Sequence, residues 1–169
     1  MPYIMTLVSL FTADSLIKYH IEKNWKSNQH RNDEKTKFKK SIIIKKYHNK
    51  GAILNIGDKN QSFVAVLSLV FSAFVTGIFV ATLGRQGKSV LKMGLALILG
   101  GAYSNTYDRL KRKYVVDYFS FSIDTRNLQN KFLKKCANKF STIVFNLADF
   151  GIMLGAMLFV ISEYNSGQD

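Results

Sequence analysis

Four long segments of the chain are predominantly apolar, and most charged residues lie between them. Residues 62–83 contain no Asp, Glu, Lys or Arg. The other three segments contain one or two charged residues each and cover 2–20 (Asp14, Lys18), 89–107 (Lys92) and 141–162 (Asp149). A helix needs about 20 apolar residues to cross the hydrocarbon core of a bilayer. The pattern therefore predicts an all-α membrane protein with four transmembrane helices.

A soluble helical bundle and a cleaved signal peptide are the alternatives to this interpretation. The helices of a soluble bundle show a polar face, and residues 62–83 have none. A signal peptide starts with basic residues and continues as an apolar stretch. The first segment lacks that basic start and carries Asp14 and Lys18 where the apolar stretch should continue, so we expect a retained helix.

The loops 23–61 and 109–140 are strongly basic. The whole chain has 24 Lys and Arg against 11 Asp and Glu, a net charge of +13. The two loops carry +8 and +7, which together exceed the net charge of the whole chain. A basic surface beside a bilayer binds anionic lipid headgroups, which we favour over nucleic acid as the partner.

Within the first loop, residues 42–44 and 52–56 are β-prone around an Asn-Lys-Gly turn. We expect one membrane domain, 1–169, with a small extramembrane β-prone loop.

Unusual polar residues gather where the predicted helices reach one face of the membrane. Four helices that alternate in direction bring the ends of the first and third to the same face as the starts of the second and fourth. Ionisable groups at membrane depth usually face a bundle interior or a wet cavity. The polar residues at these junctions are Asp14, Lys18, Asn55, Asn105, Asp108, Arg109, Asp117, Asn146 and Asp149.

Helical spacing separates structural pairs from a candidate functional acid. Asp14 and Lys18 are four residues apart, so they share a helix face and can pair. For Asp108 and Arg109 we also expect a structural ion pair. Asp149 has no basic residue within a turn or two, so it must be neutralised by protonation or by a group elsewhere in the fold.

Paired aspartates suggest a reaction that needs neither a metal nor a covalent nucleophile. Two carboxyl groups held close together share one proton. The ionised one can take a proton from water while the protonated one hydrogen-bonds the carbonyl under attack, which is aspartic peptidase chemistry. By spacing alone, Asp117 and Asp149 are one possible pair among several. Two alternative functions remain: a small ion or proton transporter, and a non-enzymatic membrane adaptor with basic loops.

Cysteine and histidine chemistry is poorly supported. Cys136 is the single cysteine, which excludes an intrachain disulfide framework and a multi-cysteine metal site. His20, His30 and His48 have no recognisable metal-ligand spacing. The sequence therefore predicts no metal and no cofactor.

Four motifs resemble those of bacterial lipoprotein signal peptidases (signal peptidase II). GGAYSNTYDR (100–109), followed by YVVDYF (114–119), is similar to the signature of their third helix, and FNLAD (145–149) to that of their fourth. Asp14-Ser-Leu-Ile-Lys18 resembles the acid-to-lysine motif of their first helix. Asn55-Ile-Gly57 resembles the asparagine–glycine motif before their second. All four occur in the family order and span most of the chain.

This resemblance implies an intramembrane aspartic endopeptidase that removes signal peptides from diacylglyceryl-modified prolipoproteins. It implies a multi-pass protein of the bacterial cytoplasmic membrane that needs no cofactor; we also expect a monomer with no nucleic acid partner. The family's catalytic aspartates match Asp117 and Asp149. Its polar support residues match Asn55, Asn105, Arg109 and Asn146, and its structural polar positions match Asp14, Lys18 and Asp108.

The loops depart from the family pattern. Lys113 stands where the family usually has a glycine before the first catalytic aspartate. Asp58-Lys59-Asn60 replace the small and aromatic residues that usually follow the asparagine–glycine motif. The segment between Asp117 and Asp149 looks longer than usual. These differences concern the loops that cover the substrate and leave the two aspartate positions unchanged.

Two rules disagree on the orientation in the membrane. The excess of Lys and Arg would place both basic loops in the cytoplasm. The resemblance implies the reverse, with cytoplasmic termini and an extracytoplasmic active face. We follow the resemblance because exported prolipoproteins present their cleavage sites on that side, and we expect the basic loops to contact the outer leaflet.

Overall fold

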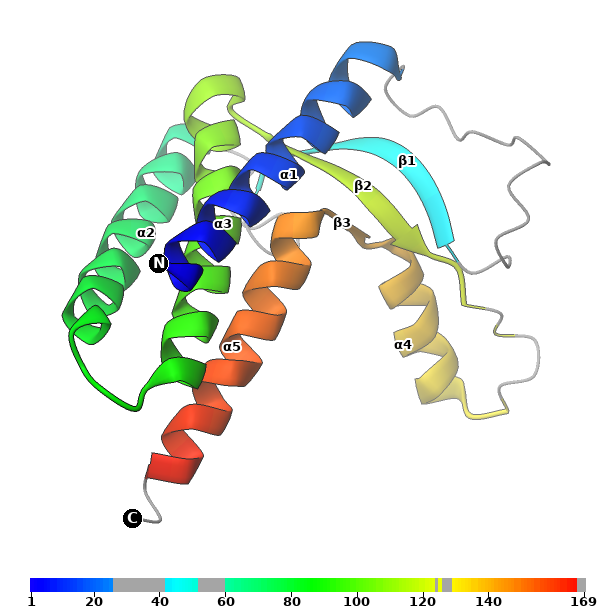
Figure 1. Ribbon diagram of the computed structural model, residues 1–169. Helices are drawn as coiled ribbons and strands as arrows, with labels where there is room; N and C mark the ends of the chain where they lie inside the picture. The colour runs from blue at the N-terminus through cyan, green and yellow to red at the C-terminus, as the bar shows by residue number, and fades with distance from the viewer. Residues whose placement is uncertain (26–41, 52–59, 124, 126–128, 167–169) are drawn as a thin grey trace. The chain divides into compact units, whose positions relative to one another are not determined.

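The computed structural model describes residues 1–25, 42–51, 60–123, 125 and 129–166. Its elements are, in chain order, α1 (Pro2–Asn24), β1 (Ile42–Asn49), α2 (Gln61–Leu83), α3 (Ser89–Arg112), β2 (Val115–Phe121), α4 (Lys131–Thr142), β3 (Val144–Phe145) and α5 (Leu147–Ser166) (Figure 1). They divide into two compact units. The helical unit consists of residues 1–17, 49–115 and 147–169, and the sheet unit consists of residues 18–48 and 116–146.

In the helical unit, α3 packs against both α2 and α5 (Figure 1). Glycines set the spacing of α3 and α5. A Cβ atom at Gly94 would lie 2.8 Å from the carbonyl oxygen of Gly155, and one at Gly101 would lie 2.4 Å from that of Ala148. Small residues allow such close backbone approach between membrane helices. Between α2 and α3 the core consists of Val75, Phe79, Leu91, Leu95, Ala96 and Leu99.

The helical unit has an apolar exterior and polar groups inside. Exposed apolar residues line α2 and α5, among them Val66, Val70, Phe74, Met153, Met157 and Val160, whereas Asp14, Ser104, Asn105 and Thr106 are buried. This is the distribution expected of helices that face lipid. Two helices, α2 and residues 147–165 of α5, are long and apolar enough to cross a membrane.

The sheet unit contains three strands in the order β1-β2-β3 (Figure 1). The central strand, β2, pairs antiparallel with β3, so that Phe119 lies opposite Phe145 and Ser120 opposite Val144. Residues 115–118 of β2 are buried, as is typical of a strand covered on both faces. α4 begins at an asparagine cap, because the side chain of Asn130 accepts hydrogen bonds from the backbone N–H groups of Phe132 and Leu133.

The predicted fourth helix, 141–162, was wrong at its start. Ser141 and Thr142 end α4, Val144 and Phe145 form β3, and α5 begins only at Leu147. An apolar run does not reveal where a strand gives way to a helix, because Val and Phe suit a buried strand as well as a membrane helix. The correction matters because it places Asn146 just before α5 rather than within it.

The predicted loop 109–140 also proved to be structured. It contains the last turn of α3, the strand β2 and the helix α4, so an all-α fold with only a β-prone loop understates the sheet. In the other loop, the first β-prone run lies in β1, which extends to Asn49. The second run, 52–56, lies outside the described residues. The single domain 1–169 stays a prediction.

Candidate functional site

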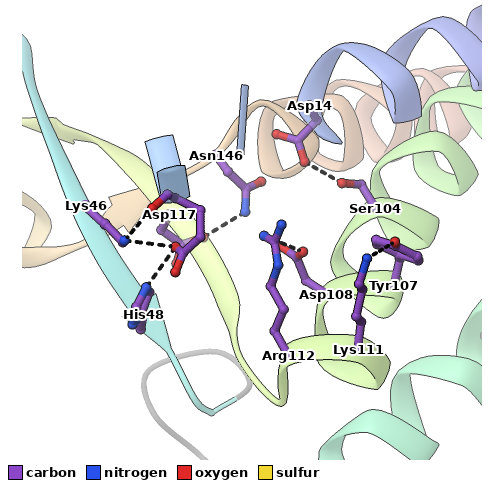
Figure 2. A network of polar contacts seen from close by, with 11 residues as sticks. Asp14, Lys46, His48, Ser104, Tyr107, Asp108, Lys111, Arg112, Asp117 and Asn146 are labelled. Carbon is purple, nitrogen blue, oxygen red and sulfur yellow. Dashed lines mark hydrogen bonds and ion pairs between the residues drawn. The ribbon is translucent and has the colours of Figure 1, made fainter. Parts of the chain in front are cut away.

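Asp117 of β2 is held by the asparagine that directly follows the neighbouring strand β3. The Nδ2 atom of Asn146 donates a hydrogen bond of 2.7 Å to Oδ1 of Asp117 (Figure 2). Both side chains are buried, Asn146 completely and Asp117 to 2% exposure. The sheet register explains the contact: continued one residue past β3, it brings Asn146 level with Tyr118, beside Asp117. Residues far apart in the sequence thus meet through strand pairing.

Asp149 is also held by an asparagine, in the helical unit. It lies in the first turn of α5, where the N-terminal end of the helix favours a negative charge. The Nδ2 atom of Asn105 on α3 donates a 3.1 Å hydrogen bond to its Oδ1 atom. Gly101 lies one turn before Asn105 and packs on the carbonyl of Ala148. The glycine therefore sets the helix separation at which the amide reaches the carboxylate.

The two predicted catalytic aspartates belong to different units. Asp117 and Asn146 are in the sheet unit, and Asn105 and Asp149 are in the helical unit. Within each unit, an amide donor meets one carboxylate. The pairing of Asp117 with Asp149 stays a prediction.

Arg109 and Asn55 were predicted as polar support. The Nη2 atom of Arg109 lies 3.5 Å from the carbonyl oxygen of Gly51, at the limit of a hydrogen bond. Arg109 thus reaches back to the chain just before the asparagine–glycine motif. Asn55 itself lies outside the described residues.

The residues predicted to be structural are all buried. Ser104 Oγ donates a 2.6 Å hydrogen bond to Oδ2 of Asp14 (Figure 2), and Lys18, one turn further along α1, is 1% exposed. Asp108 forms a 3.0 Å ion pair with Arg112, whereas the sequence suggested Arg109. The helix explains this choice, because α3 continues to Arg112 and places it four residues after Asp108 on the same face.

Sequence reasoning missed a polar cluster that joins α1 to β1 in the sheet unit. Lys46 Nζ donates hydrogen bonds to the backbone carbonyls of Glu22 (3.0 Å) and Trp25 (3.1 Å), and its ammonium lies 3.3 Å from Oε2 of Glu22. His48 Nε2 is 3.0 Å from the same oxygen. Lysine at the C-terminal end of a helix satisfies its last carbonyls. No sequence motif predicts this contact, because its residues lie in separate elements.

A second missed group consists of hydroxyl contacts between α2 and α3. Ser72 Oγ lies 3.1 Å from Thr106 Oγ1, and Thr76 Oγ1 lies 2.5 Å from the Tyr103 hydroxyl. Serine and threonine commonly hydrogen-bond across membrane helices.

In the described part of the chain, no group of three or more His, Cys, Asp or Glu side chains is arranged to hold a metal ion.

Comparison with known proteins identifies the family. The sequence profile described as signal peptidase (SPase) II matches residues 6–165. The chain belongs to the signal peptidase II family. This confirms the resemblance that the four motifs suggested, and it makes the chain a relative of proteases that process lipoproteins.

Individual relatives agree with this assignment. The lipoprotein signal peptidase of Moorella thermoacetica is 30% identical over 159 residues, which cover 94% of this chain and 89% of that protein. The one from Clostridium tetani is 30% identical over 126 residues, 71% of each chain. A solved structure described as a bacterial membrane enzyme superposes with a TM-score of 0.75 at 20% identity, covering 98% of this chain and 89% of the other. That structure supports the fold.

Proposed function

We propose that this protein is an aspartic endopeptidase that removes signal peptides from diacylglyceryl-modified prolipoproteins, with Asp117 and Asp149 as its catalytic pair. Membership of the signal peptidase II family supports the substrate. The observation that carries the mechanism is that each aspartate receives a hydrogen bond from an asparagine amide, Asn146 in one case and Asn105 in the other.

A neutral amide suits a carboxyl group that must change its protonation state. An asparagine amide does not titrate, so it fixes the orientation of the carboxyl group whether a proton is present or not. Two aspartates held in this way can exchange the roles of acid and base during one turnover.

The chain itself limits the separation of the proposed pair. Asn146 contacts Asp117 at 2.7 Å, and Asp149 follows Asn146 by three residues. Three residues reach at most about 11 Å along the backbone, and the helical turn that begins α5 is shorter than that. The length of the connection therefore permits the proposed pair.

In the proposed reaction, the ionised aspartate accepts a proton from water while the water oxygen attacks the scissile carbonyl carbon. The protonated aspartate gives its proton to the carbonyl oxygen, which yields a neutral tetrahedral intermediate. Its collapse breaks the C–N bond: the aspartate that took a proton from water gives it to the leaving amine nitrogen, and the other aspartate takes a proton from one hydroxyl group of the intermediate. The product is a carboxylic acid, and both aspartates return to their starting protonation states. Neither step needs a cofactor.

The remaining predictions concern the surroundings of the site. We propose that α1, α2, α3 and α5 all cross the bacterial cytoplasmic membrane, with the aspartates toward the extracytoplasmic face. Exposed apolar side chains on α1, such as Met5 and Val8, support its contact with lipid. We assign Arg109 and Asn55 to the substrate backbone. The acyl chains of the substrate can then remain in lipid while the scissile bond enters a wet site.

The test is cleavage of a diacylated precursor by purified protein in detergent or nanodiscs. The wild type should release a shortened product, and Asp117→Asn and Asp149→Asn should each abolish it. Glu163→Gln is the matched control, because it neutralises an exposed acid on α5. Folding of each variant is checked by helix content and thermal unfolding.

Normal cleavage by either aspartate variant would exclude the proposed pair. Cleavage of precursors that lack the diacylglyceryl group at an equal rate would contradict the proposed substrate class. A flux of protons or ions across liposomes that depends on Asp149, in a protein without peptidase activity, would favour the transporter alternative.

A further inference from the structure

α4 (Lys131–Thr142) has one basic face and one apolar face. On a helical wheel the lysines at positions 131, 134, 135 and 139 share one side, and Phe132, Leu133, Cys136 and Phe140 share the other. No Asp or Glu occurs between residues 125 and 148. A helix with this division binds at the boundary between a bilayer and water.

Within the described part of the chain, most of this apolar face is exposed. None of the residues of α4 is buried, and Phe132 and Leu133 are 70% and 51% exposed. Two large apolar side chains on adjacent positions of a short exposed helix are unfavourable in water, since burial of each such side chain is favourable. Contact with an apolar surface outside the unit would remove these side chains from water.

The C-terminal end of α4 is fixed to the sheet, which gives the helix a defined direction. The ring of Phe140 lies 5.9 Å from that of Phe121 and 5.7 Å from that of Phe145. Ser120 Oγ donates to the Ser141 carbonyl, and the Ser141 hydroxyl accepts from the backbone N–H of Ile123. The sheet therefore holds one end, while Phe132, Leu133 and Cys136 remain outside the contact.

α4 is joined to a candidate membrane helix by a short connection. Residues 143–146 alone separate it from α5, one of the two helices that are long and apolar enough to cross a membrane. Four residues reach about 14 Å at most.

We propose that α4 lies in the plane of the membrane and binds an anionic lipid surface. Its apolar face would enter the boundary between headgroups and acyl chains, and its four lysines would contact phosphate groups. Each lysine in a cluster beside a bilayer adds to the attraction to anionic lipid. The inference goes beyond the proposed hydrolysis and requires none of its steps.

The single cysteine gives a direct probe of this contact. A nitroxide label on Cys136 reports from the apolar face, and a label on Asn138→Cys in a Cys136→Ser background reports from the polar face. The full-length protein is reconstituted in phosphatidylcholine, with or without phosphatidylglycerol. The measured quantity is the ratio of label collisions with oxygen, which enriches in lipid, to those with a water-soluble nickel chelate.

With phosphatidylglycerol present, we expect this ratio to rise several-fold at position 136 and to change little at position 138. Replacing all four lysines of α4 by glutamine should abolish the rise, whereas replacing them by arginine should preserve it. Salt at about 1 M should weaken it by screening. Because none of these side chains is buried, the variants should keep their fold, which helix content confirms.

Equal water exposure of positions 136 and 138 in both lipid mixtures would overturn the proposal. Protection of Cys136 by soluble polyglutamate or RNA, but not by phosphatidylglycerol, would overturn it in favour of a macromolecular acidic partner. The labelling is repeated with Asp149→Asn, which should give the same result. Absence of peptidase activity would therefore not contradict the proposed membrane contact of α4. A labelling result that contradicts this contact would not affect the peptidase proposal.

Discussion

Asn146 donates a 2.7 Å hydrogen bond from its amide to the carboxyl group of Asp117, and both residues are buried. The amide comes from the short connection between β3 and α5, whereas the acid comes from the central strand of the sheet. The contact therefore joins the strand that carries one proposed catalytic acid to the segment that leads into the other.

We expect Asn146→Ala to lower the catalytic rate about 100-fold, because a carboxyl group that loses its orienting donor leaves the productive geometry. KM should change little, since the substrate is still bound. The measurement is steady-state cleavage of the diacylated precursor.

Asn138→Ala, on the exposed polar side of α4, is the matched control and should keep wild-type kinetics. A variant at position 146 with an unchanged rate would show that the amide has no part in orienting Asp117. Thermal unfolding separates this effect from the loss of about 1–3 kcal/mol expected when a buried acceptor loses its donor.

The spacing of α3 and α5 is testable through Gly101. In Gly101→Ala the new methyl group would lie 2.4 Å from the carbonyl oxygen of Ala148, so the helices must separate. The hydrogen bond from Asn105 to Asp149 lies one turn away and should lengthen. We expect a lower melting temperature and a lower catalytic rate in detergent.

Gly77→Ala is the control for this variant. Position 77 lies in α2, and a methyl group added there would have nothing within 4 Å, so alanine should be neutral or slightly stabilising because it favours helix. If both variants behaved alike, close packing of α3 against α5 would not be what positions Asp149.

Apolar patterning was a good guide to three of the four long helices. The predicted ranges 2–20, 62–83 and 89–107 lie inside α1, α2 and α3, because a long apolar run has few stable alternatives. The fourth range failed at its start, where Val144 and Phe145 pair with β2. Strand pairing depends on tertiary contacts, which an apolar run in the sequence does not specify.

The candidate site residues could be proposed from the sequence by residue type. Motif order selected the aspartates and the asparagines, but the sequence did not show which amide meets which acid. That depends on strand register for Asn146 and on helix packing for Asn105. α4 was missed as an element because its lysines mark the segment as a basic loop unless the apolar positions between them are followed at helical spacing.

The pair formed by Asp14 and Ser104 is expected to support the fold rather than the chemistry. Both side chains are almost completely buried, and their 2.6 Å hydrogen bond joins α1 to α3. Ser104→Ala removes the donor and should destabilise the protein by about 1–3 kcal/mol, measured by unfolding in detergent. The folded fraction should keep its catalytic rate.

Ser9→Ala, at an exposed position of α1, should leave stability unchanged. A large loss of catalytic rate in fully folded Ser104→Ala would contradict the structural role and place Asp14 among the functional residues.

Lys113 occupies a backbone conformation that favours glycine. It ends α3 with φ of 67° and is the one non-glycine residue with positive φ in the described ranges. A side chain in the left-handed region costs roughly 1–2 kcal/mol, whereas glycine adopts it readily. We expect Lys113→Gly to raise the free energy of unfolding by about 1 kcal/mol and to preserve cleavage. Lys111→Gly, two residues earlier inside α3, should instead destabilise by about 1 kcal/mol. If the free energy of unfolding rises in Lys113→Gly and falls in Lys111→Gly, backbone conformation and not the loss of a charge decides the effect. Destabilisation by both changes would contradict this explanation.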